Sequence, residues 1–454
     1  MNSHLAAAVT LAVTMSASCA PRTSSRPEPI EAAGIWEGTA RTGEVSLPLT
    51  VTIDRRTAGW AGTVDVPSLY ALEYPLTDLR VTATTVAFSL PGNLPSATFE
   101  GVLEQGRLQG RFTSLAGPDT LRGTFELWRR PGGTLQYVTE SVRFGNGDLD
   151  LAGTILRPST NGSHPAIVLV HGSGPQTRDS YLRWFADQFA RAGFVALIYD
   201  KRGTGESGGE RWPQTVGSFD DLADDAVAGA RFLADRPYVE ADRIGIWGLS
   251  QGAWIGPLAA ARAPTLFRFV IMVAGGGVSP AEQELYDDEA RLRDLGFERA
   301  EIEEALAYLR LADQYVRTGS DADWSRFASA RGDVRDEAWY SHLDRFPQIL
   351  PREAPAWSGL RADLDYDPAP VLATVQVPAL LILGVEDRLT PALATAERAR
   401  RALENGGNRD VTVRLLPGAD HALLTKPDGL GSWLAERPAA NWVADMIAWA
   451  LERK

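Results

Sequence analysis

Short runs in which apolar and polar residues alternate follow one another between residues 34 and 130. Gly, Pro, Asp or another turn-forming residue separates each run from the next. The runs are 34–38, 47–53, 60–66, 81–90, 97–103, 107–113 and 121–128. Because successive side chains on a strand point to opposite faces, this pattern predicts an antiparallel all-β unit, either a small barrel or a sandwich. We place this accessory domain at residues 31–135 and expect it to have a structural or substrate-positioning role; the alternative is a separate ligand-binding module.

Near-continuous apolar runs replace the alternating pattern from about residue 137 onward, and helical stretches separate them. The clearest runs are 166–170, 194–199, 243–247, 269–274 and 379–383. Strands that are apolar on both faces and alternate with helices are typical of a mostly parallel sheet covered by helices on both sides. We therefore expect an α/β domain over residues 136–454.

A charge-rich helical stretch interrupts this alternation at about residues 280–366. It contains 11 Arg, no Lys and 20 Asp and Glu, a net charge of 11 − 20 = −9. The stretch also carries aromatic residues of its own, among them Trp324, Trp339, Tyr340, Phe346 and Trp357. An insertion of this kind between two core strands predicts a helical cap or lid, most of whose charges lie on solvated helix faces.

The first twenty residues combine an apolar run, 5–15, with the small residues 16–20. The run is too short to span a bilayer, which needs about 20 residues, and its length is typical of a signal peptide. We expect an exported protein, periplasmic, membrane-anchored or secreted; the alternative is a disordered N-terminus on a cytoplasmic protein. Cys19 falls where a lipoprotein signal places its lipidated cysteine, so a lipid anchor there is one exported outcome. Residues 21–30, rich in Pro, Ser and Arg, predict a flexible linker.

Charge and composition exclude several classes of function. The 454 residues include 58 Asp and Glu against 45 Lys and Arg, a net charge of −13. Proteins that bind nucleic acid need basic patches to neutralise phosphates, so nucleic acid is not an expected partner. The single cysteine excludes an intramolecular disulfide and a multi-cysteine metal site. With no His-Glu-x-x-His motif and no other segment of transmembrane length, we expect no metal, no cofactor and no membrane span.

A Gly-Leu-Ser-Gln-Gly motif occupies residues 248–252, directly after the apolar run 243–247 and before a helical stretch. In this context Gly-x-Ser-x-Gly predicts a sharp strand-to-helix turn that exposes the serine hydroxyl. Gly248 and Gly252 relieve the crowding around that turn. The start of the helix directs free N–H groups at the reacting centre. We therefore predict that Ser250 is a nucleophile.

A serine hydroxyl is a weak nucleophile without an adjacent base. His421 follows the predicted strand 411–416 and precedes the last helix, which makes it the candidate base. The other histidines fall in the leader, an exposed turn, the loop after 166–170 and the cap: His4, His164, His171 and His342. The base needs a carboxylate that orients its ring. Asp387, which follows the run 379–383, is the predicted partner, and Glu386 is the alternative.

The negative oxygen that forms during acyl transfer needs hydrogen-bond donors already in place. The backbone N–H of Gln251, next to the nucleophile, is one expected donor. The other is expected from the loop after 166–170, at Ser173 N–H, with Gly172 and Gly174 leaving room for the backbone to approach. In this interpretation His171 braces the loop and is not a base.

These motifs together resemble the α/β-hydrolase family, in which the triad also follows the order Ser, Asp, His. The segments that carry the resemblance are His-Gly-Ser-Gly-Pro at 171–175, Tyr-Asp-Lys-Arg-Gly-Thr-Gly-Glu-Ser at 199–207, and the residues around Ser250, Asp387 and His421. The chain is similar in particular to exported bacterial carboxylesterases with an N-terminal β-domain. It is similar more distantly to dienelactone hydrolases and prolyl-oligopeptidase-type peptidases. The resemblance covers about residues 140–454 and implies an α/β-hydrolase fold.

The residues and the resemblance together predict a metal-free serine hydrolase that cleaves small carboxylic esters through an acyl-enzyme. One alternative is a serine peptidase of the aminopeptidase type on the same fold. A second alternative, from a different class, is a non-catalytic binding protein on a hydrolase scaffold, because fold alone does not determine function.

Overall fold

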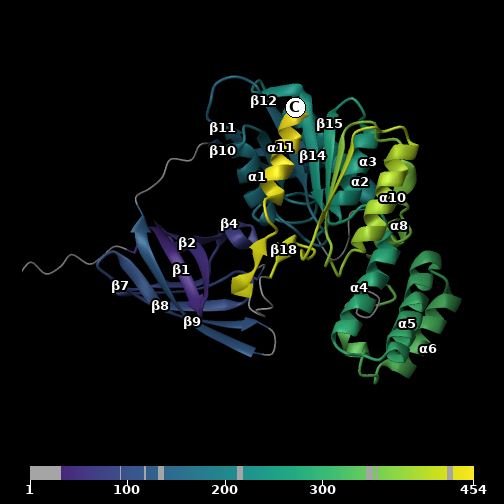
Figure 1. Ribbon diagram of the computed structural model, residues 1–454, viewed down its shortest axis with the longest axis horizontal. Helices are drawn as coiled ribbons and strands as arrows, with labels where there is room; N and C mark the ends of the chain where they lie inside the picture. Colours follow the sequence, from purple (N-terminus) through teal and green to yellow (C-terminus); the bar gives the residue numbers. More distant parts are fainter. Residues whose placement is uncertain are drawn as a thin grey trace, which may run out of the picture.

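The computed structural model describes residues 32–92, 94–116, 119–130, 137–211, 218–343, 351–353, 356–426 and 433–453. The predicted leader 1–20, its Cys19 and the linker 21–30 lie outside these residues. Figure 1 shows three parts: a β-domain formed by residues 34–130, a central sheet between helices, and a group of helices projecting from it. Within the described ranges, no helix is both long and apolar enough to cross a membrane.

The β-domain is one antiparallel sheet of nine strands in the order β4-β3-β2-β1-β9-β8-β7-β6-β5. The strands are β1 (Gly34–Thr42), β2 (Val45–Arg56), β3 (Gly59–Val66), β4 (Ala71–Pro75), β5 (Thr77–Val81), β6 (Thr85–Ser89), β7 (Ala97–Glu104), β8 (Arg107–Ala116) and β9 (Asp119–Arg130). Strand β7 alternates strictly between buried and exposed residues. Only Leu76 separates the two edge strands β4 and β5, and its N–H donates to Gly62 O of β3 at 2.9 Å. The sheet therefore curls around its apolar face, where Trp36, Phe88 and Phe99 are buried.

The central sheet has eight strands in the order β10-β11-β13-β12-β14-β15-β16-β17. They are β10 (Tyr137–Asn146), β11 (Leu149–Pro158), β12 (His164–Val170), β13 (Val195–Tyr199), β14 (Val239–Leu249), β15 (Phe267–Val273), β16 (Ala379–Gly384) and β17 (Val411–Leu416). Strand β11 pairs antiparallel with both of its neighbours, β10 and β13. The strands from β13 to β17 in the sheet order pair parallel with one another. Strands β13 and β16 are buried along their whole length, as expected for a sheet covered on both faces.

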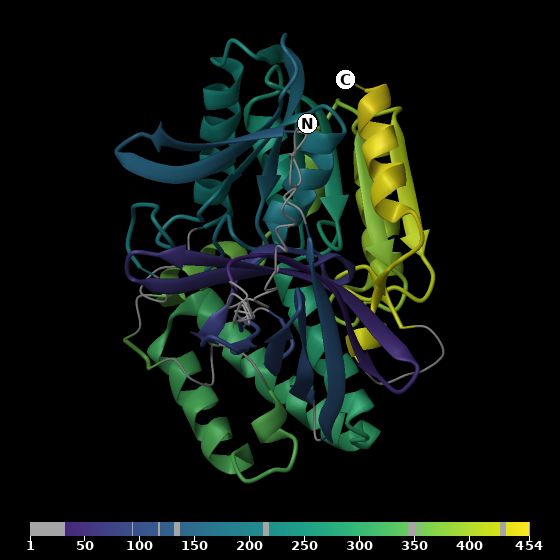
Figure 2. The same ribbon diagram turned by 90° about the vertical axis from the view of Figure 1, so that its left-hand side faces the viewer.

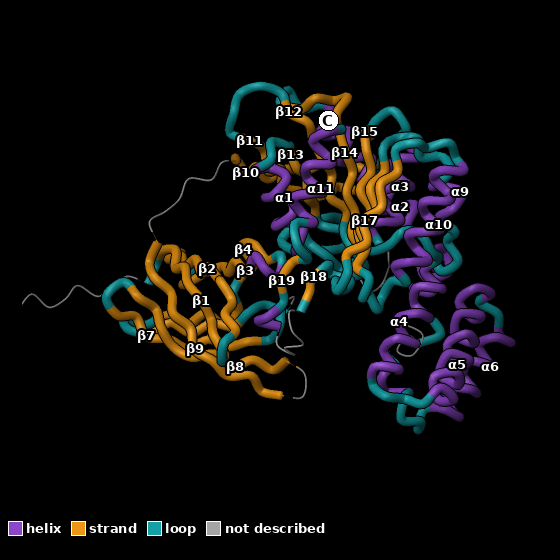
Figure 3. Tube along the Cα trace, in the orientation of Figure 1, coloured by secondary structure: helices purple, strands orange, loops and turns teal. Residues whose placement is uncertain are grey.

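Helices cover both faces of the central sheet (Figure 3). Side chains of α1 (Tyr181–Arg191) and α11 (Trp442–Glu452) pack in the core on one face, and those of α2 (Phe219–Ala234), α3 (Gly252–Arg262) and α10 (Ala392–Asn405) in the core on the other. The arrangement confirms the predicted fold class, an α/β sheet with a preceding all-β domain.

The predicted cap region contains α4 (Pro280–Asp294), α5 (Arg299–Thr318), α6 (Asp321–Val334) and α8 (Ala356–Asp363), between β15 and β16. These helices have an apolar core of their own, in which Leu309, Phe327 and Trp339 are fully buried. In Figure 1 the cap helices and the β-domain both lie below the central sheet, on opposite sides of the picture. Figure 2 shows the nine-stranded sheet toward the viewer.

Tyr70 fixes the β-domain to the central domain. Its ring packs against Trp184, Phe185 and Trp442, with ring centroids 5.0, 5.2 and 6.0 Å away. The hydroxyl accepts a hydrogen bond from Trp442 Nε1 at 2.9 Å and donates one to Leu423 O at 3.2 Å. The side chain is only 4% exposed, so both bonds are sheltered from water.

In a second contact, side chains from the C-terminal part of the chain enter the core of the β-domain. Trp433 and Leu434, which come from the C-terminal part of the chain, are buried in the core of the β-domain. The indole Nε1 of Trp433 donates to Ser114 Oγ at 3.0 Å. Arg183 of α1 also pairs with Glu73 of the β-domain at 2.6 Å. The β-domain is therefore packed on the central domain through side chains from both.

We expect the substitution Tyr70→Phe to lower the free energy of unfolding by about 1–3 kcal/mol, because it leaves the buried indole N–H of Trp442 without its acceptor. Urea unfolding followed by tryptophan fluorescence measures this. Tyr74→Phe is the matched control, since Tyr74 is equally buried and its hydroxyl makes no hydrogen bond to any residue that the structure describes. Equal midpoints for the two variants would contradict the role of the Tyr70 hydroxyl.

Candidate active site

Ser250 occupies a strained turn between β14 and α3. Its φ of +56° lies in the left-handed region, which non-glycine residues rarely adopt. The neighbouring glycines make this turn feasible: a Cβ on Gly248 would lie 2.0 Å from Gly252 O, and one on Gly252 would lie 2.7 Å from Val170 O. The N–H of Ser250 donates to Val273 O at 2.8 Å and anchors the turn to β15. The sequence motif thus folds as a close-packed strand-to-helix turn around Ser250.

His421 and Asp387 lie on the loops after β17 and β16 and contact each other directly. His421 Nδ1 is 2.8 Å from Asp387 Oδ2. The other carboxylate oxygen, Oδ1, accepts the N–H groups of Leu389 and Thr390, both at 2.8 Å. Asp387 is 1% exposed, whereas the alternative partner Glu386 points to solvent. The buried carboxylate of Asp387 therefore orients the imidazole.

Ser250 and His421 are not joined by a hydrogen bond in this structure, and Ser250 Oγ forms none with any other described residue. Both residues nonetheless follow the carboxyl ends of parallel strands of the same sheet, β14 for Ser250 and β17 for His421. Hydrogen bonds between catalytic groups are often long without substrate and tighten when it binds. A hydrogen bond from the serine hydroxyl to His421 Nε2 would complete the arrangement that the sequence predicts.

His171 is held in the neutral state. Its Nε2 hydrogen-bonds Tyr199 O, and burial lowers the pKa of its imidazole to about 3. A ring that is neutral near pH 7 and whose Nε2 bonds a backbone carbonyl is placed to brace the loop that follows β12. Among the described residues, His421 is the histidine paired with a carboxylate.

The loop after β12 presents the expected donor Ser173. The N–H of Gly172 is already used, because it donates to Tyr181 Oη at 2.8 Å. Gly174 adopts a left-handed φ of +80° with open space where a Cβ would be. Ser173 is exposed on this loop, and Gln251 begins the first turn of α3. The backbone N–H groups of Ser173 and Gln251 form no hydrogen bond with any described residue, which leaves them free for a ligand.

Lys201 joins these two segments and was not singled out from the sequence. Its ammonium Nζ donates to Gly172 O at 3.0 Å, Gly174 O at 3.3 Å and the Gln251 side chain at 2.6 Å. All three N–H donors of the ammonium are thus used. The only feature of the sequence that could have pointed to Lys201 is its place directly after a buried strand, in the segment 199–207. A side chain that bridges two loops from different elements is a non-local feature, which the pattern does not predict.

The Gly-rich segment 203–208 forms a closed turn around Asp200. The carboxylate of Asp200 accepts Arg178 Nη1 at 2.7 Å and the N–H of Glu206 at 2.8 Å. A Cβ on Gly205 would lie 2.3 Å from Asp200 Oδ2. The absence of a side chain at Gly205 therefore allows the turn to pack closely around the Asp200 carboxylate.

A cavity of about 490 Å³ adjoins His421. The β-domain supplies Leu69, Tyr70, Tyr74, Leu94 and Pro95 to its lining, and the central domain supplies Pro175, Gln176, Thr177, Ser180, Tyr181, Phe185, Leu249, His421, Ala422, Leu424 and Glu436. No described residue of the cap region 280–366 is among them. Leu249 and His421 together place the cavity beside the serine turn and the candidate base.

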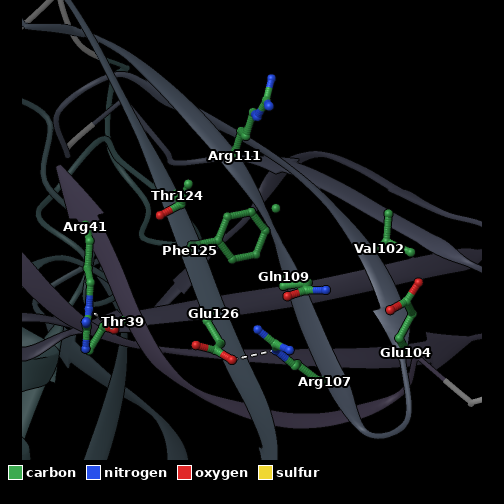
Figure 4. A pocket seen from close by; sticks show the side chains of 11 residues that line it. Thr39, Arg41, Val102, Glu104, Arg107, Gln109, Arg111, Thr124, Phe125 and Glu126 are labelled. Atoms are coloured by element: carbon green, nitrogen blue, oxygen red, sulfur yellow. Dashed lines mark hydrogen bonds and ion pairs between the residues drawn. The ribbon is translucent and has the colours of Figure 1, made fainter.

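A second hollow, of about 500 Å³, lies on the outer face of the β-domain, over β1, β7, β8 and β9. Figure 4 shows its charged side chains, among which Arg107 pairs with Glu126 at 2.5 Å. All of its lining residues belong to the β-domain, so it lies apart from Ser250 and His421.

The pH dependence of stability tests the burial of Lys201. Burial lowers the pKa of its ammonium from 10.5 to about 7, so the folded protein binds this proton less well than the unfolded chain. The cost of burying the charge is therefore largest below pH 7 and diminishes as the pH rises towards 10.5. We expect the unfolding free energy of the wild type, relative to Lys201→Met, to rise by about 2 kcal/mol between pH 7 and pH 9. Urea unfolding of both proteins at the two pH values measures this; parallel changes would contradict it.

Comparison with known proteins identifies the family. The model of the alpha/beta hydrolase family matches residues 167–431, more than half of the chain. The quorum-quenching protein AidA of Acinetobacter baumannii is 31% identical over 111 residues, which are 24% of this chain and 36% of that protein. Esterase EstD of Thermotoga maritima is 32% identical over 165 residues, 35% of this chain and 38% of that protein.

The chain thus spans well under half the length of these two relatives. An esterase of Pyrococcus furiosus of known structure has 18% sequence identity and a TM-score of 0.44, over 70% of this chain and 92% of that one. The span matched by the family model contains the serine turn and the Asp387–His421 pair, and by this match the protein belongs to the alpha/beta hydrolase family.

Proposed function

We propose that the protein is a serine hydrolase that cleaves carboxylic esters through an acyl-enzyme. The observation that carries the proposal is the 2.8 Å contact between His421 Nδ1 and the buried Asp387 carboxylate, at the same edge of the sheet as the left-handed turn at Ser250. A nucleophile, a base and a group that orients the base are the three parts that such a reaction needs.

In the proposed reaction Ser250 Oγ attacks the ester carbonyl carbon while its proton passes to His421 Nε2. The resulting imidazolium is stabilised by Asp387, which accepts the Nδ1 proton in a hydrogen bond and keeps its own charge. The oxygen that becomes negative accepts the N–H groups of Ser173 and Gln251. Collapse of this intermediate expels the alcohol, which takes the proton from His421. Water, deprotonated by the same histidine, then releases the acid and restores Ser250.

The chemistry of the cavity favours an ester over a peptide with a free amino group. An aminopeptidase needs an unpaired carboxylate to hold the ammonium of its substrate, because an unpaired charge is costly to bury. Glu436, the only carboxylate that lines the cavity among the described residues, is paired with Lys426 at 2.9 Å. The relative EstD, which is named an esterase, is in line with this choice.

The substitution Ser250→Ala tests the nucleophile. A small fluorophosphonate loses fluoride when an activated serine attacks its phosphorus, so the wild type should gain one covalent label at Ser250, located by peptide mass mapping. We expect Ser250→Ala to lose the label and several orders of magnitude in kcat, since removal of the equivalent serine in a triad enzyme costs about 10⁶-fold. Ser163→Ala, in an exposed turn, is the control and should label normally. Labelling of the Ser250→Ala variant at another serine would reject the assignment.

The substitution Asp387→Asn separates the two acidic candidates. We expect kcat to fall about 10⁴-fold, because an amide no longer holds the imidazole in the required tautomer. Glu386→Gln, a neighbouring change of the same chemistry on an exposed side chain, should leave kcat within about twofold. Ester hydrolysis with saturating substrate measures both. A larger loss for the Glu386 variant would assign the role to Glu386 instead.

A further inference from the structure

We infer that the β-domain forms one wall of the substrate pocket and that this pocket takes a neutral, ring-bearing apolar group of the ester. The inference rests on the proposed function and adds to it the part of the chain that selects the substrate. The first observation is position, because the cavity of about 490 Å³ is bounded by His421 and by Leu249, the residue before Ser250. A group bound there is attached to the ester bond being cleaved.

The walls of the cavity come from two domains. Leu69, Tyr74 and Leu94 belong to the β-domain, and Tyr181 and Phe185 belong to α1 of the central domain. Tyr74 is 4% exposed and Leu94 is 7% exposed, so their side chains face inward. Without the β-domain, the α1 side of the cavity and His421 would face solvent.

The β-domain wall is held in a fixed position. Tyr70, next to Leu69 in the chain, is wedged among Trp184, Phe185 and Trp442 and hydrogen-bonded at its hydroxyl. Glu73, next to Tyr74, is ion-paired with Arg183. Leu69 and Tyr74, two of the residues that line the cavity, are thus each adjacent to a residue that anchors the β-domain to the central domain. A pre-formed apolar wall binds a ligand without the cost of ordering it.

The residues that line the cavity determine which kind of chemical group can bind in it. Leucine, proline and aromatic side chains dominate it, and Glu436, the one carboxylate among the described lining residues, is already paired with Lys426. An anionic or strongly polar group would lose its hydration there without gaining a charged partner. A volume of about 490 Å³ lies in the range of small-molecule sites and accommodates a phenyl or naphthyl group.

The test compares three esters by pH-stat titration: ethyl acetate, which has no ring; benzyl acetate, with the ring on the alcohol; and ethyl phenylacetate, with the ring on the acid. The variant Leu69→Trp fills the cavity from the β-domain side. We expect it to lower kcat/KM at least about tenfold for one of the ring-bearing esters, with ethyl acetate changed by less than twofold. The ester that is affected identifies whether the alcohol or the acyl group enters the cavity.

Leu115→Trp is the matched control, because Leu115 lies in the same domain, is 67% exposed and does not line the cavity. A second variant, Leu69→Ala, enlarges the cavity and is expected to raise kcat/KM for the naphthyl analogue of the affected ester relative to its phenyl parent. This variant remains informative if the tryptophan variant fails to fold.

The inference is overturned if Leu69→Trp changes all three esters equally, or none of them, while Leu69→Ala leaves the naphthyl-to-phenyl ratio unchanged. Failure of the proposed function gives a different result. In that case the wild type is not labelled at Ser250 by the fluorophosphonate and hydrolyses none of the three esters.

Discussion

The left-handed backbone at Ser250 is the constraint on which the site depends. A non-glycine residue in this region costs free energy, so the surrounding structure must enforce it. Here Gly248 and Gly252 allow the backbones of β14, α3 and β12 to approach to distances that no Cβ would permit. The buried strand before the turn and the helix after it fix both ends. Because the turn is this close, the serine hydroxyl emerges at the strand edge with the free N–H groups of α3 next to it.

Much of this arrangement is local in sequence and could be predicted from it. The continuous apolar runs gave the parallel sheet, and the fold class is confirmed. Gly248 and Gly252, two residues before and after Ser250, predict the turn, because the crowding that they relieve arises from residues close in the sequence. The positions of Asp387 and His421 after successive strands follow from the rule that loops at the carboxyl ends of parallel strands meet at one edge.

The contacts that the sequence did not reveal are those between segments far apart in the chain. Lys201 bridges the loop after β12 and the start of α3, and Tyr70 packs against α1 and α11. Neither position has a periodicity or motif that identifies its partner. The cavity beside His421 is also formed by segments far apart in the chain and was not predicted from the sequence. The sequence suggested the cap 280–366 as the lid, because an inserted helical segment is the obvious cover. Among the described residues the lining comes instead from the β-domain and the central domain.

Docking of the β-domain also bears on the loop that carries His421, the candidate base. Leu423, two residues after His421, has a left-handed φ of +58°. Its carbonyl accepts two hydrogen bonds, one from Ala439 N–H at 2.9 Å and one from the Tyr70 hydroxyl at 3.2 Å. A strained residue persists only where its surroundings determine its conformation, and one of the groups that does so here belongs to the β-domain. The same tyrosine therefore anchors the wall of the cavity and stabilises the loop that carries His421. The position of His421 and the formation of the cavity are thus coupled through a single side chain outside the central domain.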